Sequence, residues 1–117
     1  MQVLAEILTL NGLTNGGSLD ISAGAEIKLI GYNSSNSFEA GGSLAGDGSF
    51  SLEAGLTVNA AQNVAVQNFN LATGYGLAGT GELTFSKSFN WSNGLVECPV
   101  VIAPSGILNL TAAGGSL

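Results

Sequence analysis

The chain has 117 residues, of which 45% are hydrophobic and only 9% are charged, with a formal net charge of −6. This balance excludes an intrinsically disordered chain, and the length limits it to one domain spanning residues 1–117. Lys28 and Lys87 are the only basic residues, so the chain lacks the cations that contact phosphate backbones and anionic membrane surfaces. We therefore expect no nucleic-acid partner. We also expect no membrane insertion, because the sequence contains no apolar run of about 18 residues.

The residues that catalysis needs are also scarce. The chain has no His and no Arg, which excludes Ser–His and Cys–His nucleophiles and zinc sites built on His. The eight acidic residues are scattered rather than paired as glycoside hydrolysis requires. The single Cys98 has no partner for an internal disulfide, and its apolar surroundings predict a buried core residue. We expect no enzyme, no cofactor and no resident metal.

Backbone preferences favour an all-β chain with little or no helix. The chain has 18 Gly and only two Pro, and Asn, Ser and Thr are abundant. Gly and Asn accept the positive φ angles of tight corners, and Ser and Thr suit strands and turns. Strong helix formers such as Lys, Arg and Gln are nearly absent.

The first segment, residues 2–10, is apolar and predicts a strand over residues 7–10, although one or two turns of helix over residues 3–8 would also fit. Asn11-Gly12 and residues 15–17 are turn signals. The polar stretch 32–37 predicts a loop at a corner. Further along, residues 64–66 and 69–71 predict a pair of short strands.

An internal repeat organises most of the chain, with copies led by Leu13, Leu44, Leu77 and Leu95. In the first three copies a glycine follows four residues after the leucine and an alternating segment begins at six. The segments of the fourth copy begin one residue early. A local phrase, Gly-Gly-Ser-Leu, also recurs at residues 16–19, 41–44 and 114–117.

The repeat predicts a single-stranded β-solenoid of short coils. The lead leucines are 31, 33 and 18 residues apart, so a coil of roughly 16–20 residues would make each longer gap about two coils. Single polar residues between apolar ones fit strands with one face on a narrow core and one in water. These residues are Lys28, Ser51, Thr84, Asn90 and Asn109. Asn and Gly at recurrent corners would stack into ladders. A β-sandwich is the alternative fold.

Three motifs have both a functional and a structural interpretation. Residues 74–79 match G-x-G-x-x-G, but a strand rather than a helix follows, which favours a solenoid corner over a dinucleotide site. Residues 41–48 resemble a calcium-binding nonapeptide in one displaced copy, and Asp20 and Asp47 would align if the copies align. Phe85, Phe89 and Trp91 would form a sugar-stacking platform, yet their repeat positions predict core filling.

The stretches 81–85, 89–95, 100–102 and 106–110 resemble the repeat units of filamentous-haemagglutinin-like and adhesin-type β-helices, which are large secreted bacterial surface proteins. In that family glycine, a strand, a Trp-Ser-Gly-like corner and another strand recur. The resemblance implies a right-handed β-helix at the cell surface or outside the cell. It also implies a stalk or adhesive filament without catalytic activity.

A solenoid has two open ends, which natural solenoids cover with polar capping repeats. This chain begins with apolar residues and ends within a repeated phrase. We expect either a segment of a longer fibre or a subunit that stacks head to tail on further copies of itself in a non-closing contact. The candidate contacts are Val3, Leu4, Ile7, Leu8, Leu10, Leu110 and Leu117.

The first functional hypothesis is therefore a structural subunit of an extracellular β-solenoid filament. The alternative is an adhesin segment that binds glycan or a cell surface through corner loops, with Tyr32, Asn33 and Tyr75 as candidate contacts. A carbohydrate-active β-helix enzyme is a third and weaker hypothesis, because only two basic residues are available to such a site.

Overall fold

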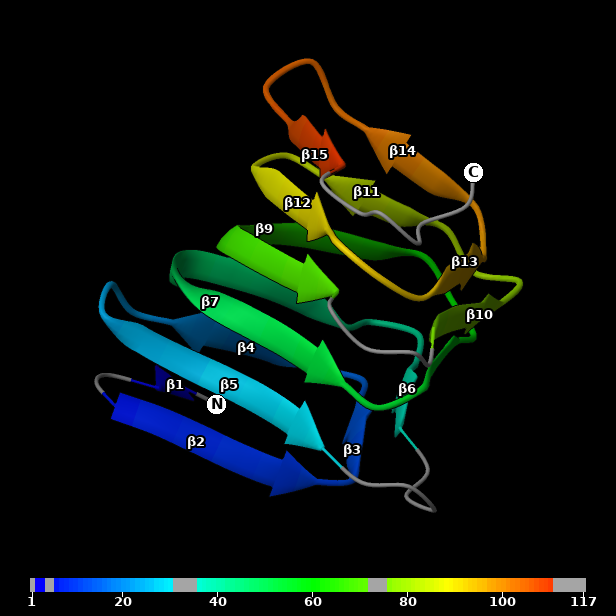
Figure 1. Cartoon of the computed structure of the whole chain (residues 1–117). Helices are drawn as coiled ribbons and strands as arrows, with labels where there is room; N and C mark the ends of the chain where they lie inside the picture. Colours follow the sequence, from blue (N-terminus) through cyan, green and yellow to red (C-terminus); the bar gives the residue numbers. More distant parts are fainter. Residues whose placement is uncertain (1, 4–5, 31–35, 72–75, 111–117) are drawn as a thin grey trace.

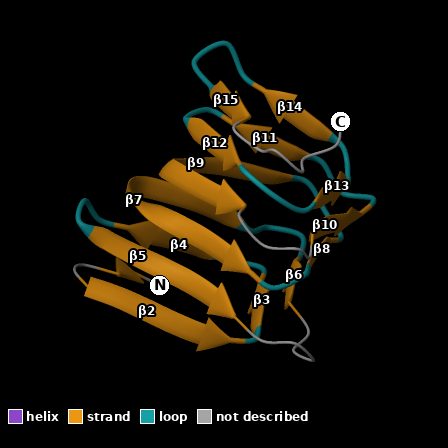
Figure 2. Cartoon of the chain, in the orientation of Figure 1, coloured by secondary structure: helices purple, strands orange, loops and turns teal. Residues whose placement is uncertain are grey.

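The structure is a computed structural model and describes residues 2–3, 6–30, 36–71 and 76–110. Every regular element in these ranges is a strand and none is a helix (Figure 2). The strands wind into a right-handed, single-stranded β-solenoid of about five turns (Figure 1). All strand pairs are parallel, each coil pairing with the coils before and after it. The predicted solenoid is confirmed, and the sandwich and the helix at residues 3–8 are wrong.

Each turn of the solenoid contributes to three faces. The first face contains β1 (Gln2–Val3), β4 (Ser18–Ile21), the first halves of β7 (Ser43–Glu53) and β9 (Gln62–Leu71), β11 (Leu83–Phe85) and β14 (Val100–Ile102). The second face contains β2 (Glu6–Asn11), β5 (Ala25–Ile30), the second halves of β7 and β9, β12 (Ser88–Trp91) and β15 (Ile107–Leu110). The third face contains β3 (Leu13–Asn15), β6 (Asn36–Phe38), β8 (Leu56–Val58), β10 (Gly76–Gly79) and β13 (Leu95–Glu97).

Parallel pairing places chemically similar residues in columns along the solenoid axis, which we call ladders. One inward ladder of the second face contains Leu8, Ile27, Phe50, Phe69, Phe89 and Leu108. Its neighbour contains Leu10, Leu29, Leu52, Leu71, Trp91 and Leu110. Because side chains alternate between the faces of a strand, the residues between these two ladders point outward.

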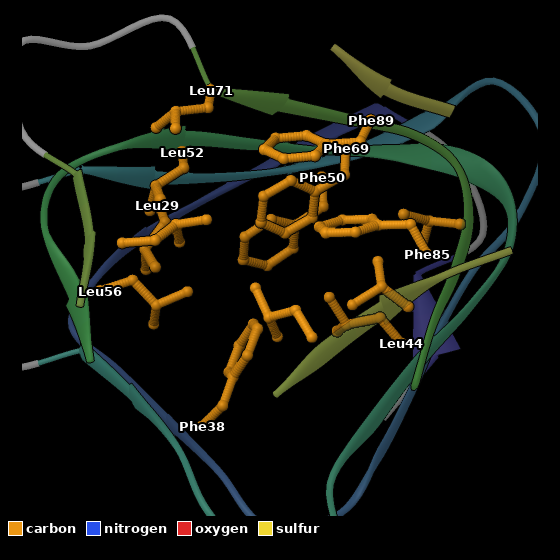
Figure 3. Packing of buried hydrophobic residues seen from close by; sticks show 14 of the residues in the cluster. Leu29, Phe38, Leu44, Phe50, Leu52, Leu56, Phe69, Leu71, Phe85 and Phe89 are labelled. Carbon is orange, nitrogen blue, oxygen red and sulfur yellow. The ribbon is translucent and has the colours of Figure 1, made fainter. Parts of the chain in front are cut away.

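The inward ladders form one continuous apolar core. Figure 3 shows the phenylalanines pointing into the space that the coils enclose. The rings of Phe50 and Phe69 stack with centroids 5.2 Å apart, and those of Phe85 and Phe89 stack at 4.3 Å. Phe69 meets Phe85 edge-on at 5.3 Å, which joins the two stacks. Phe85, Phe89 and Trp91 are buried in this core, as their repeat positions predict.

The register corrects the alignment of the repeat copies. Leu13, Leu77 and Leu95 lie on the third face, but Leu95 pairs with Gly76 rather than with Leu77. Leu44 lies on the first face and pairs with Leu19. Phe50 accordingly pairs with Ile27 rather than joining the ladder of Leu19. The recurring phrase Gly-Gly-Ser-Leu indicates the right register here, because Ser18 pairs with Ser43. The cause is unequal coil length, which shifts any alignment made from chain spacing alone.

Other predictions are wrong in detail. Residues 62–71 form the single strand β9 rather than two strands, and Asn36 and Ser37 belong to β6 rather than to a loop. Asp20 pairs with Ala45, whereas Asp47 lies in the irregular step between Gly46 and Ser49, so the two carboxylates do not align. Residues 76–79 of the G-x-G-x-x-G motif form β10, which pairs with β8 and β13.

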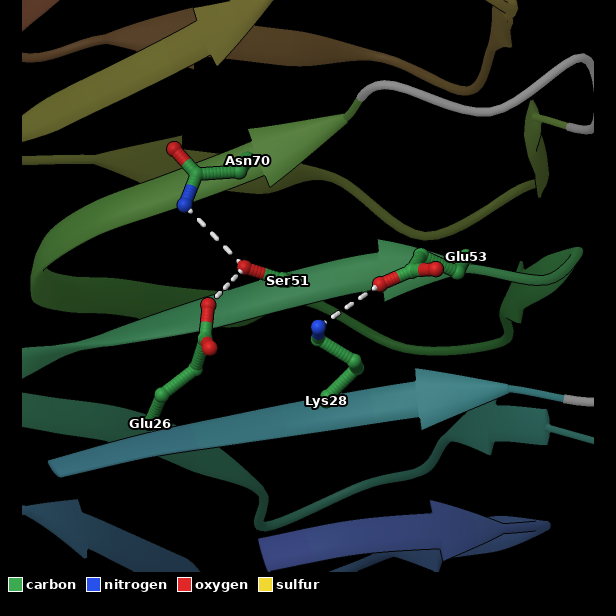
Figure 4. Close-up of polar contacts among 5 residues, drawn as sticks. All are labelled: Glu26, Lys28, Ser51, Glu53 and Asn70. Carbon is green, nitrogen blue, oxygen red and sulfur yellow. Dashed lines mark hydrogen bonds and ion pairs between the residues drawn. The ribbon is translucent and has the colours of Figure 1, made fainter. Parts of the chain in front are cut away.

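A polar ladder runs along the outside of the second face instead of along the corners. Lys28, Ser51, Asn70, Asn90 and Asn109 are successive register partners. Figure 4 shows the Asn70 side chain bonded to Ser51, Ser51 bonded to Glu26, and Lys28 paired with Glu53 at 3.4 Å. The predicted outward positions of Lys28, Ser51, Asn90 and Asn109 are thus confirmed, and the predicted Asn stacking occurs at strand centres.

Candidate assembly surfaces at the two ends

The N-terminal end of the solenoid consists of the edge strands β1, β2 and β3. Within the described ranges, each of these strands pairs with a strand of the next coil on one side only. Leu8, Leu10 and Leu13 pack against the core from this edge but are only partly buried. Ile7 points outward on β2 and is 58% exposed. Among the described strands, β1, β2 and β3 therefore form an unpaired parallel edge (Figure 1), and the partly exposed start of the apolar core lies beside it.

The C-terminal end consists of the edge strands β13, β14 and β15. Val96, Val100 and Ile102 are partly buried against the core from these strands. Leu108 is 41% exposed, whereas Phe89, its partner one coil earlier in the same ladder, is 1% exposed. Leu110 is likewise 43% exposed against 4% for Trp91. These leucines are exposed because no described coil covers them, and not because they point outward.

The described edge strands carry few of the features that keep sheet edges from pairing with other chains. Soluble proteins commonly protect such edges with lysine, inward-pointing charges or proline within the strand. The charged residues of the six edge strands are Glu6 and Glu97. Both lysines lie elsewhere and face carboxylates, Lys28 at Glu53 and Lys87 at Asp47, 3.1 Å away. Pro99 and Pro104 lie between strands, so neither removes an N–H group from an edge strand.

The structure thus groups the predicted assembly residues at opposite ends. Ile7, Leu8 and Leu10 lie on β2 at one end, and Leu110 lies on β15 at the other. Val3 lies on the edge strand β1, where it pairs with Ile21. Leu4 and Leu117 lie outside the described residues, as do the candidate surface contacts Tyr32, Asn33 and Tyr75. The glycan-binding hypothesis therefore gains no structural observation.

Sequence reasoning missed several residues of the two ends. Leu13, Val96, Val100, Ile102 and Leu108 all contribute to the exposed core but were not among the predicted contacts. A usable signal was present for Leu108, because it alternates with Leu110 and so shares its face. The others require the register, since their places at an end depend on which coils they pair with.

Among the described residues, two titratable groups have shifted pKa values, and neither lies on an edge strand. Burial raises the pKa of the Cys98 thiol, which is a free, buried cysteine as predicted. Hydrogen bonds from Asn59 and then Ser37 lower the pKa of the exposed Glu39 carboxyl. Among the residues that the structure describes, no three acidic or cysteine side chains gather as a metal site would need. No helix in the described ranges is long and apolar enough to span a membrane.

Comparison of the chain with protein-family models, with curated proteins and with solved structures finds no match. The functional argument therefore depends on the geometry of the two ends.

Proposed function

We propose that the chain is a non-catalytic structural segment of an extracellular β-solenoid filament, in which coils continue from one copy to the next by end-to-end strand stacking. The observation that supports this most directly is the exposure of the core at both ends, where inward leucines such as Leu108 and Leu110 lack a covering coil in the described structure. Stacking another coil would bury them and pair the edge strands.

The two ends also match each other in composition. The inward edge residues are aliphatic at both ends: Leu8, Leu10 and Leu13 at one, and Val96, Val100, Ile102, Leu108 and Leu110 at the other. Contact between the ends removes apolar surface from water, which is favourable by about 25 cal/mol per Å². A contact between two different surfaces that does not close into a ring propagates into a filament. The extracellular location is part of the proposal and is supported by the resemblance of residues 81–110 to bacterial surface β-helices.

Two complementary variants test this proposal. Leu110→Lys places a charge on the exposed part of the apolar core at the C-terminal end, and Leu10→Lys places one on the exposed part at the N-terminal end. Every stacking contact needs one end of each kind, so neither variant can assemble alone. An equimolar mixture still offers one intact C-terminal end and one intact N-terminal end. It should therefore form a heterodimer and nothing larger, measured by analytical ultracentrifugation.

The wild-type chain should form filaments visible by negative-stain electron microscopy at a concentration where both variants stay monomeric. Asn63→Lys is the matched control, because Asn63 is exposed in the middle of the solenoid on the first face and its substitution should leave filaments intact. Circular dichroism checks that each variant keeps its strands. A wild-type chain that remains monomeric up to millimolar concentration would refute the proposal.

A further inference from the structure

From Asn109 to Ser51 the outward polar ladder of the second face is a continuous chain of side-chain hydrogen bonds, and from Ser51 the chain continues to Glu26, two residues before the ladder residue Lys28 on β5. Asn109 Nδ2 donates to Asn90 Oδ1 at 2.7 Å, and Asn90 Nδ2 donates to Asn70 Oδ1 at 2.8 Å. Asn70 Nδ2 donates to Ser51 Oγ at 3.1 Å, and the Ser51 hydroxyl donates to Glu26 Oε2. Every donor lies on the C-terminal side of its acceptor, so the chain has one direction along the axis.

This direction follows from the chemistry of the groups. An ionised carboxylate only accepts hydrogen bonds, so Ser51 must donate to Glu26. The Ser51 hydroxyl has one proton, and its oxygen therefore accepts from the Asn70 amide. Asn70 Oδ1 is then left to accept from Asn90, and Asn90 Oδ1 to accept from Asn109. Glu26 thus sets the orientation of three successive carboxamides.

The two ends of this ladder carry complementary groups. At the C-terminal end, the exposed Asn109 uses its amide N–H toward Asn90, and its Oδ1 is the next acceptor in the series. At the N-terminal end, Thr9 is exposed and occupies the same ladder position, since it pairs with Lys28. A threonine hydroxyl supplies the donor that the series requires.

From this arrangement we infer that copies of the chain stack head to tail in one register, with Thr9 of each copy donating to Asn109 Oδ1 of the copy before it. This inference rests on the proposed function and specifies its interface. In this register Leu8 lies over Leu108 and Leu10 over Leu110, because each pair belongs to one ladder.

Other arrangements fit less well. A shift of one residue would place the inward leucines of β15 opposite outward residues of β2, because side chains alternate along a strand. Contact between two C-terminal ends brings together two copies of the acceptor Asn109 Oδ1. In the inferred register the acidic residues of the ends do not meet. Glu6 lies on the second face, where it pairs with Ala25, whereas Glu97 lies on the third face and pairs with Ala78.

Disulfide trapping tests the register in a Cys98→Ala background, which removes the native thiol. Thr9→Cys and Asn109→Cys are made on separate chains of different mass and mixed under mild oxidation. In-register parallel neighbours have Cα atoms about 4.8 Å apart, within the range of about 4.4–6.8 Å that a disulfide spans. Ile7→Cys with Asn109→Cys is the control, because a two-residue offset increases the Cα separation to about 8 Å.

The expected result is a cross-linked heterodimer from the Thr9→Cys and Asn109→Cys pair and none from the control pair. If filaments form but only the control pair cross-links, or Asn109→Cys cross-links to itself, the inferred register or polarity is wrong while the proposed function stands. If neither pair cross-links although filaments form, the inference is also wrong. Absence of filaments from the wild-type chain would refute both.

A second measurement tests the hydrogen bond itself. Asn109→Ala removes the acceptor from the interface, and a neutral hydrogen bond is worth roughly a fivefold change in an association constant. The critical concentration for assembly should therefore rise about fivefold. Asn63→Ala, on the exposed middle of the first face, should leave it unchanged. Equal critical concentrations for the wild type and Asn109→Ala would refute a role for this ladder in assembly.

Discussion

Phe69 is the residue whose removal should damage the core most. Its side chain is fully buried at the middle of the solenoid, and its ring lies 5.2 Å from that of Phe50, 5.3 Å from that of Phe85 and 5.7 Å from that of Phe89. Truncating a buried phenylalanine to alanine costs about 3–5 kcal/mol. Aromatic pairs contribute about 0.5–1.5 kcal/mol beyond burial, and the three pairs of Phe69 place its truncation at the upper end of the range for such truncations. We therefore expect Phe69→Ala to cost about 5 kcal/mol.

This loss is comparable with the whole stability of a small domain, about 5–15 kcal/mol, so Phe69→Ala could leave the chain unfolded. Phe69→Leu is therefore a second variant, which keeps most of the side-chain volume and should cost about 1–2 kcal/mol. Leu110→Ala is the matched control at the C-terminal end, where the side chain is already 43% exposed, and it should cost about 1 kcal/mol.

The assay is urea denaturation followed by the fluorescence of Trp91, the single tryptophan, which is stacked on Phe89 in the core. It should be carried out at concentrations where sedimentation detects no assembly, because association would add to the apparent stability. If Phe69→Ala lowers the free energy of unfolding no more than Leu110→Ala does, the central aromatic cluster does not stabilise the fold as argued.

Three further predictions concern single positions. Gly79→Ala should lower the free energy of unfolding by more than about 2 kcal/mol, because φ is 117° there and the new Cβ would lie 2.2 Å from a backbone atom of β8. Gly55→Ala is the control: its Cβ would enter open space and should change that free energy by less than about 0.5 kcal/mol. Equal costs in urea titration would contradict this prediction. The pKa of Glu39, measured by NMR titration, should lie below its ordinary value and should return toward it in Asn59→Ala. The contribution of Glu39 to stability is therefore present above the ordinary pKa and is lost as the pH falls through the lowered pKa. An unchanged pKa in the variant would exclude Asn59 as the cause. Because burial raises the pKa of the Cys98 thiol, a thiol reagent at neutral pH should modify it only on unfolding, and rapid modification of the folded chain would show that it is accessible.

The strands were largely predictable because alternation is a local property. The alternating segment that begins six residues after Leu77 forms the strand β11 (Leu83–Phe85), and Phe89 and Trp91 point inward as their repeat positions indicate. Leu44 was misaligned because the copies were matched by spacing along the chain. Partners on successive coils are as close in sequence as Leu83 and Val100 and as distant as Ser18 and Ser43, so no single period relates them.

The candidate assembly surfaces were only partly predictable for a related reason. The apolar character of Leu8, Leu10 and Leu110 is visible in the sequence, and so is the expectation that a solenoid has two ends. Whether a given leucine is exposed depends on a neighbouring coil, as the contrast between Leu108 and Phe89 shows, although both occupy the same ladder position.

By itself, the sequence determined the fold class, the alternation of inward and outward residues, and the shortage of groups for catalysis. These properties depend on composition and on residues two positions apart. Only the tertiary structure decided the register between coils, the direction of the hydrogen-bond chain from Asn109 to Glu26, and the shared ladder position of Thr9 and Asn109. Such relations arise because parallel strands pair residues from different coils, and corner lengths, which no local pattern encodes, set which residues meet.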